Sequence, residues 1–175
     1  MATTPHPDKD SLIRLLRQHH GGEPWHGPSR AALLEGVTAA VAAWHPGAGA
    51  HSIWETVLHM RSWTDEVRER ARGKVPDRTA EPVGGDWPRV TDTSEAAWRA
   101  AVASLDAAHA RLLEVVAAMT DAQLAARVGV TPESPQGTGI RVRTMLRSLA
   151  EHDVYHCGQV SLLKRLARAA LGLEQ

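Results

Sequence analysis

The sequence predicts an all-α protein arranged as a four-helix bundle, and three observations support this. Four long segments repeat apolar residues at helical spacing, so each would bury one face against its neighbours. No segment has the alternation of apolar and polar residues that is typical of a half-buried strand. Stretches rich in Gly and Pro separate the helical segments. Because 175 residues fit one domain, we expect residues 1–175 to form a single bundle.

Composition describes an ordinary globular protein with no global attraction to charged partners. Hydrophobic residues make up 43% of the chain and charged residues 23%. The 20 Lys and Arg residues balance the 20 Asp and Glu residues, so net charge favours neither nucleic acid nor an acidic membrane as a partner. No apolar run has the length of a membrane span, and the first residues lack the order of a secretory signal. With Cys157 as the single cysteine, we expect a cytoplasmic protein without disulfides.

The first 50 residues are predicted to hold one long helix and two short helical pieces. Leucines at helical spacing indicate a helix over residues 8–20, and a Gly-Gly pair then breaks it. Ser29 can cap a short piece over residues 30–36. Thr38 can cap another that ends near Trp44, before a loop rich in Gly.

A second long helix is expected from Ser52 to about Arg72. Ser52 is a good N-cap residue and Glu55 follows three positions later, which is the pattern of a capping box. The apolar stripe of this helix comprises Ile53, Val57, Met60, Trp63 and Val67. On a helical wheel His59 lies beside Trp63, at the edge of the stripe.

A long connection, residues 74–92, follows this helix and contains several Pro and Gly residues. Connections of this length usually carry function. Trp87 lies within it and is a candidate lid over a pocket, because the indole combines a large apolar body with one N–H donor.

The third helix is expected from residue 93 or 94 to about Met119, with a bundle-type seam that includes His109. Thr120 can cap a short turn that ends at Leu124, and a second loop is expected over residues 131–139. The last helix is expected from residue 141 or 142 to Leu171. Its predicted inward positions are Val142, Met145, Leu149, His152, His156, Gln159, Leu163, Leu166 and Ala170.

His152 and His156 are four residues apart within the last helix, so their imidazoles lie on the same face and can share one metal ion. The alternative is a pair of core histidines whose hydrogen bonds are satisfied by the protein. Polar groups at inward positions need partners, so a metal, a ligand or other side chains must meet them. A bundle can bring His59 toward this pair, and three imidazoles with one open position are typical of a catalytic zinc site. The alternative for His59 is an ordinary residue at the boundary between the buried and exposed faces of an amphipathic helix.

Other polar residues are weaker candidates for a functional role. His109 could be a fourth ligand, could support the ligands, or could be a core histidine, and His26 belongs to a turn that could cover one end of the bundle. Cys157 has no obvious general base and is interpreted as a small buried hydrophobe. Four carboxylates could orient the imidazoles, although most are expected on the solvated face: Glu55, Glu66, Glu151 and Asp153.

Two segments, HSIWETVLHM at residues 51–60 and AEHDVYHCGQV at residues 150–160, resemble the DinB/YfiT-like superfamily. The segment order and the Trp-His-Gly-Pro turn at residues 25–28 also match. The resemblance implies an up-down-down-up four-helix bundle with long connections, in which His59, His152 and His156 hold one divalent metal ion, typically zinc or nickel. Cys157 departs from the family, where a small residue such as Ala is usual, and His109 is not part of the family triad.

The resemblance also implies a small-molecule substrate and a homodimer. Characterised relatives activate a low-molecular-weight thiol, as in bacillithiol S-transferases and mycothiol-dependent isomerases, and others are described as metal-dependent hydrolases. We therefore expect a metal-dependent thiol S-transferase or hydrolase, with a metal-activated thiol or water as nucleophile. The alternative is a stress-related helical bundle that binds a metal or small ligand without turnover. Candidate pocket residues are Trp63, Trp87, His109, Tyr155 and Gln159.

Overall fold

The computed structural model describes residues 7–47, 49–74, 81–82, 84–129 and 139–173. These residues form helices and connecting segments without a strand, apart from one isolated antiparallel bridge between Arg127 and Arg141. The predicted all-α class is confirmed. In the described ranges, no helix combines the length and apolarity needed to cross a membrane.

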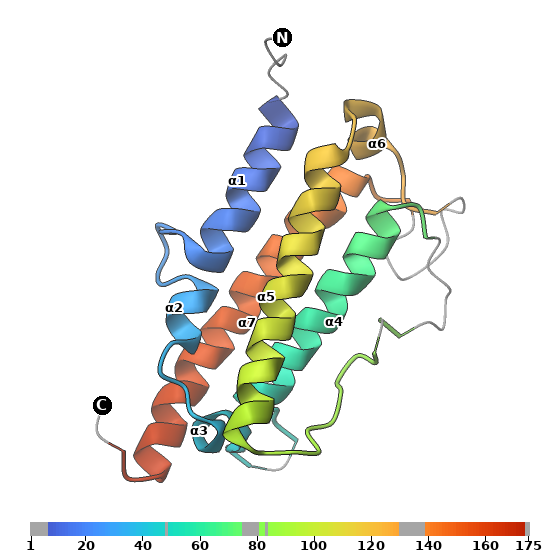
Figure 1. Cartoon of the computed structure of the whole chain (residues 1–175). Coiled ribbons are helices and arrows are strands. Elements are labelled where there is room, and N and C mark those ends of the chain that lie inside the picture. The colour runs from blue at the N-terminus through green and yellow to red at the C-terminus, as the bar shows by residue number, and fades with distance from the viewer. Residues whose placement is uncertain (1–6, 48, 75–80, 83, 130–138, 174–175) are drawn as a thin grey trace.

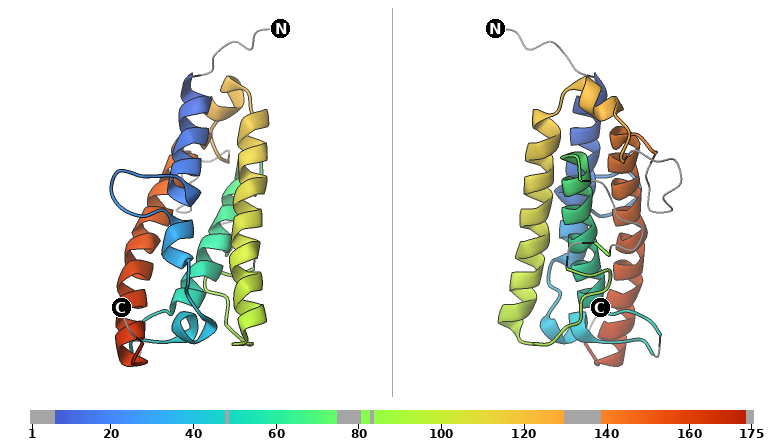
Figure 2. Two further views of the ribbon diagram at one scale, coloured as in Figure 1. Left: turned by 60° about the vertical axis from the view of Figure 1, so that its left-hand side comes forward. Right: turned by 90° about the vertical axis from the view of Figure 1, so that its right-hand side faces the viewer.

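Four long helices lie side by side along the molecule (Figure 1), and three short helices join or cover them. The long helices are α1 (Pro7–Gly21), α4 (Ile53–Ala71), α5 (Glu95–Ala118) and α7 (Val142–Ala170). The short helices are α2 (Arg30–Leu34), α3 (Ala39–Ala43) and α6 (Asp121–Ala125). Helices α1 and α7 run in one direction and α4 and α5 in the other, so α1 begins and α7 ends at opposite ends of the molecule (Figure 2).

The start of α4 is fixed by its predicted capping box. The Ser52 hydroxyl accepts the Glu55 backbone N–H at 3.1 Å, and the Glu55 carboxylate accepts the Ser52 backbone N–H at 2.9 Å. Such a cap typically stabilises a helix by about 1 kcal/mol. It also sets the register of the helix, which places His59 about two turns further along, on the side that packs against α7.

The long connection after α4 follows from the helix directions. Because α4 and α5 run the same way, the chain must return along the length of the molecule before α5 can begin (Figure 1). Residues 75–80 and 83 of this connection lie outside the described residues. The part that is described carries Asp86 and Trp87 back over α4. Most of the second predicted loop, residues 130–138, also lies outside the described residues.

The core consists of two apolar clusters with a polar level between them. One cluster, near α3, includes Ile53, Val57, Met60, Trp98, Leu105 and Val160. The other, near α6, includes Leu12, Leu16, Leu112, Val116, Leu146 and Leu149. The buried polar side chains between them include Arg30, His59, His109, Asp153 and His156. We call these five residues the polar layer. Buried polar groups need hydrogen-bond or ionic partners, so the polar layer is the first place to look for a functional site.

The inward face of α7 differs from the prediction in its second half. Leu166 is 44% exposed and Ala170 is exposed, whereas Val160 and Ala167 are buried. The predicted seam alternated three and four residues, a period of 3.5, but a straight α-helix drifts by about 20° per heptad against that period. The inward face therefore moves on by one residue, which also makes Asp153 more buried than its neighbour His152.

Candidate metal centre

The three histidines predicted as metal ligands meet between α4 and α7. The Nε2 atom of His59 lies 3.0 Å from that of His152, and the Nε2 atom of His156 lies 3.1 Å from the same atom. One ligand nitrogen from each ring falls within 4.8 Å of the other two. His152 and His156 converge because they are one helical turn apart, and helix packing brings in His59. Three imidazoles so placed could hold a divalent ion.

Hydrogen bonds to the outer nitrogens fix the tautomers of two of these rings. The Nδ1–H of His59 donates to the backbone carbonyl of Asp86 at 2.7 Å. The Nδ1–H of His156 donates to the side-chain oxygen of Gln159, also at 2.7 Å. Because both acceptors are carbonyl oxygens, the proton of each neutral ring is on Nδ1, and Nε2 keeps its lone pair. Both rings therefore direct an unprotonated nitrogen at the same place, as metal ligands do.

The third ring, that of His152, lies near a carboxylate but makes no hydrogen bond to it. The Nδ1 atom of His152 is buried without a hydrogen-bond partner among the described residues, and so is Oδ1 of Asp153, 3.8 Å away. The other oxygen of Asp153 accepts from Arg30 at 2.6 Å. If Nε2 of His152 binds a cation, the proton of the ring must be on Nδ1, facing this carboxylate. The donor set and its surroundings therefore fit a divalent metal ion.

Burial favours the neutral form of two of the candidate ligand rings, His59 and His156. Loss of solvent lowers the pKa of His59, and the neighbouring His152 lowers it further. Burial and the proximity of His152 lower the pKa of His156 to about 4. A metal ion competes with protons for imidazole, so neutral rings favour metal binding.

Asp86 and Trp87, from the long connection, support His59 from outside. The carboxylate of Asp86 accepts the indole N–H of Trp63 at 2.8 Å, which fixes the residue whose backbone carbonyl binds His59. Trp87 stacks on His59, with ring centroids 3.9 Å apart and planes at 9°. It also stacks on His51 at 3.5 Å, with planes at 1°. Trp87 therefore covers the ring of one candidate ligand.

A cavity of about 520 Å³ opens beside His156. Three of the predicted pocket residues, Trp87, Tyr155 and Gln159, line it. Trp63 does not line it, but contacts His59 edge to face and binds Asp86. The remaining lining residues come from the loop after α3, from the first turns of α4 and from the second half of α7: Pro46, Gly49, Ala50, His51, Thr56, Leu162, Leu163 and Leu166.

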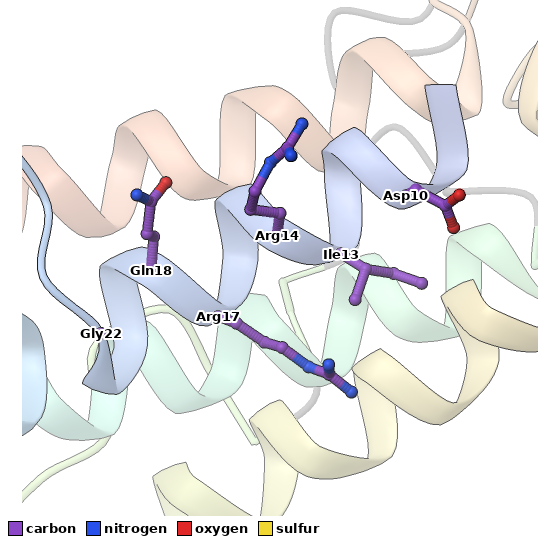
Figure 3. A pocket seen from close by; sticks show the side chains of 6 residues that line it. All are labelled: Asp10, Ile13, Arg14, Arg17, Gln18 and Gly22. Atoms are coloured by element: carbon purple, nitrogen blue, oxygen red, sulfur yellow. The ribbon is translucent and has the colours of Figure 1, made fainter. Parts of the chain in front are cut away.

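A second hollow, of about 440 Å³, lies along α1 and contains none of the three histidines. Its longest side chains, Arg14 and Arg17, point to different sides of α1 rather than toward one another (Figure 3). Side chains that do not converge define no ligand site, so the cavity beside His156 is the relevant one.

His109 lies apart from the three-histidine cluster. It is buried and stacks on His20, with ring centroids 4.2 Å apart. Burial and the positive charge of Arg30 lower its pKa to about 3. The structure thus places His109 in the core rather than at the candidate centre. The other histidine-bearing turn also stays outside, because Trp25, next to His26, is 96% exposed and covers nothing.

Two of the four carboxylates that could orient the imidazoles are buried and ion-paired. Asp153 binds Arg30, and Glu66 binds Arg70 at 2.8 Å and Lys74 at 2.7 Å. Glu66 therefore orients no histidine. Sequence reasoning missed Arg30 altogether. The available signal was its position in the short apolar piece RAALL, where a charged side chain needs a buried partner.

Cys157 is partly buried, as its interpretation as a small hydrophobe requires. Burial and the nearby Asp153 carboxylate raise the pKa of the thiol to about 12. Since the thiolate is the nucleophilic form, this thiol is inert near neutral pH.

Fold and site together define an all-α protein with a candidate three-histidine metal centre between two of its long helices. The family profile of the DinB superfamily matches residues 30–160, and the chain belongs to this superfamily. The matched range begins at α2 and includes all three histidines. The resemblance seen in the two sequence segments is therefore confirmed. Comparisons with curated proteins and with solved structures gave no match.

Proposed function

We propose that His59, His152 and His156 bind one divalent metal ion, zinc or nickel, at which a thiol or water is activated for group transfer or hydrolysis. The observation that carries this proposal is the pair of outer hydrogen bonds, from His59 to Asp86 and from His156 to Gln159. They leave the Nε2 lone pairs of His59 and His156 directed at the third imidazole, that of His152. When bound, a divalent ion lowers the pKa of a water or thiol ligand and acts as a Lewis acid.

The protein's own contribution is binding, orientation and exclusion of water. Asp86 and Gln159 hold two imidazoles in one tautomer, while Trp87 covers His59. His156 and Gln159 both line the cavity, so a substrate there lies against a candidate ligand. We further propose that the four long helices form the four-helix bundle of the superfamily. The homodimer and the cytoplasmic location stay predictions.

A non-catalytic binding bundle is the second candidate, and one observation favours it. Among the described residues that line the cavity there is no lysine, aspartate or glutamate, so His51 and Tyr155 are the only side chains there, besides the candidate ligand His156, that could act as a general acid or base. Thiol cosubstrates and electrophiles, assayed with and without Zn²⁺ or Ni²⁺, separate the two candidates. Turnover that follows metal occupancy supports the enzyme, and tight binding without product supports the binding bundle.

Metal analysis of protein purified without a metal-affinity tag tests the centre itself. We expect one ion per chain, and loss of that ion in His59→Ala, His152→Ala and His156→Ala. His26→Ala is the matched control, because His26 is exposed and outside the centre. Wild-type protein that takes up no zinc or nickel, with unchanged stability in the three variants, would contradict the proposal.

A further inference from the structure

The cavity beside His156 is unusual in its lack of charge. Its twelve described lining residues include no lysine, arginine, aspartate or glutamate. The carboxylate of Glu55, next to the lining residue Thr56, is engaged in the α4 cap and lies 3.6 Å from Nδ1 of His51 and from Nε2 of His45. Away from the candidate metal ion at His156, a ligand carboxylate or phosphate in the cavity would therefore lose water without gaining the partner that a lysine or arginine provides.

One wall of the cavity is an apolar face of α7. Tyr155, Leu162 and Leu166 are 65%, 51% and 44% exposed, and they line the cavity together with Leu163. Residues 155, 159, 162 and 166 follow helical spacing, so they form one continuous stripe that begins beside His156. Contiguous exposed apolar side chains at a cavity are typical of a ligand-binding surface.

Two of the polar side chains in the cavity, Gln159 and Thr56, carry no ionisable group. The side-chain oxygen of Gln159 is engaged by His156 at 2.7 Å, which leaves its amide N–H groups available as donors. The hydroxyl of Thr56 donates to the backbone carbonyl of Ser52 at 2.8 Å. The cavity thus combines a short polar end with a long apolar wall.

We propose that this cavity binds an uncharged, largely apolar small molecule, whose single polar end lies against His156 and Gln159. The inference rests on the proposed metal site only for the identity of that end, which would be a thiol or hydroxyl group. The occupant is a small molecule rather than a second copy of the chain, because the apolar stripe is continuous with the candidate metal centre. Small thiols that carry carboxylates are excluded as preferred ligands, since nothing among the described lining residues would compensate their charge.

Two fluorescent probes that differ by one charge test this selectivity. N-phenyl-1-naphthylamine is neutral, and 1-anilinonaphthalene-8-sulfonate adds a sulfonate to the same rings. We expect the folded full-length protein to bind the neutral probe at least tenfold more tightly. Leu166→Lys places a cation in the apolar wall and should narrow or reverse this preference. Leu171→Lys is the control, because Leu171 is equally exposed near the end of α7 but does not line the cavity.

Equal or tighter binding of the sulfonate by the wild type would overturn the proposal. So would a neutral probe that binds Leu166→Lys as well as it binds the wild type. Light scattering of wild type and Leu162→Asn tests the other occupant: a wild-type dimer that the substitution dissociates, with no probe binding, would assign the stripe to a second copy. Because neither probe is a metal ligand, titrations of His59→Ala separate the two proposals. Loss of metal with unchanged probe selectivity leaves this inference standing.

Discussion

Arg30 of α2 donates a hydrogen bond of 2.6 Å to Asp153 of α7, the residue next to His152, and both side chains are buried. Burial alone would raise the pKa of the Asp153 carboxyl, but the Arg30 guanidinium holds it below its ordinary value. The ion pair thus fixes a carboxylate, with its charge balanced by Arg30, next to the candidate ligand His152. It also joins α2 to α7, the helix that carries two of the three histidines.

Arg30→Met should destabilise the fold by about 3–5 kcal/mol, because it leaves the Asp153 carboxylate buried without its partner. The double variant Arg30→Met/Asp153→Leu should recover much of that loss, since it removes both charges. Urea unfolding monitored by circular dichroism measures both. The exposed pair of Arg143 and Asp8, at 3.0 Å, is the control, and Arg143→Met should cost less than about 1 kcal/mol. A single variant as stable as wild type would show that the buried pair contributes little.

The contacts of Asp86 should matter for metal affinity more than for stability. Trp63→Phe removes the 2.8 Å hydrogen bond that fixes Asp86, whose backbone carbonyl orients His59. We expect the affinity for zinc to fall by about tenfold, the lower end of the usual range for residues that orient a ligand. Competition with a chromophoric chelator measures it.

Trp98→Phe provides the control for this experiment. It removes another indole hydrogen bond, to the backbone carbonyl of Val37 at 2.6 Å, which is buried in the apolar cluster near α3, whereas that of Trp63 is partly buried. Zinc affinity should be unchanged there even if stability falls. If both substitutions lower the affinity alike, the contribution of Asp86 is not specific to the site.

Much of the fold was predictable because helical periodicity and capping are local properties. Ser52 and Glu55 form the predicted capping box, and the long helices begin and end within a few residues of their predicted bounds. The spacing of His152 and His156 fixed their common face, which needs no tertiary information. The partner on α4 required the family resemblance, because the pattern alone left His59 at the edge of a stripe.

What escaped prediction depends on exact helix period and on contacts between distant segments. Asp153 was predicted only as one of four carboxylates that could orient an imidazole or lie on the solvated face, whereas the true period of 3.6 residues turns it inward, toward a short helix more than 100 residues earlier in the chain. The neighbours of Trp87 were equally beyond local patterns. They depend on how the long connection crosses α4. The directions of α4 and α5 determine that path, and these directions are known only from the whole fold.

Cys157 should resist alkylation in the native protein. Because burial and Asp153 raise the pKa of its thiol to about 12, the thiolate is scarce at pH 8. Iodoacetamide should therefore label the protein only after unfolding in urea, as followed by intact-mass spectrometry. Cys157→Ala should keep full metal content. Rapid labelling of the folded chain at pH 8 would contradict this prediction and make Cys157 a candidate nucleophile.

His109 should make the fold sensitive to acid. Its pKa is about 3 in the folded protein, through burial first and Arg30 second, against an ordinary value of 6.5. The unfolded chain therefore binds a proton at higher pH than the folded chain does. The stability linked to neutral His109 is complete above pH 6.5 and is lost as the pH falls from 6.5 toward 3. At pH 5 the loss should be about 2 kcal/mol, at roughly 1.4 kcal/mol per pKa unit.

His109→Leu should flatten this dependence, because leucine fills the buried space without a group to titrate. Urea unfolding at pH 7.5 and pH 5 gives the change in free energy for each protein, and the wild type should lose about 2 kcal/mol more than the variant between these values. His26→Leu is the comparison, since an exposed histidine should leave the wild-type dependence intact. The remaining acid sensitivity of His109→Leu then reports on other histidines whose pKa is lowered, among them the partly buried His20, whose pKa burial and Arg30 lower. Identical losses in wild type and His109→Leu would mean that His109 takes up a proton as readily in the folded chain as in the unfolded chain, so that its pKa is not lowered by folding.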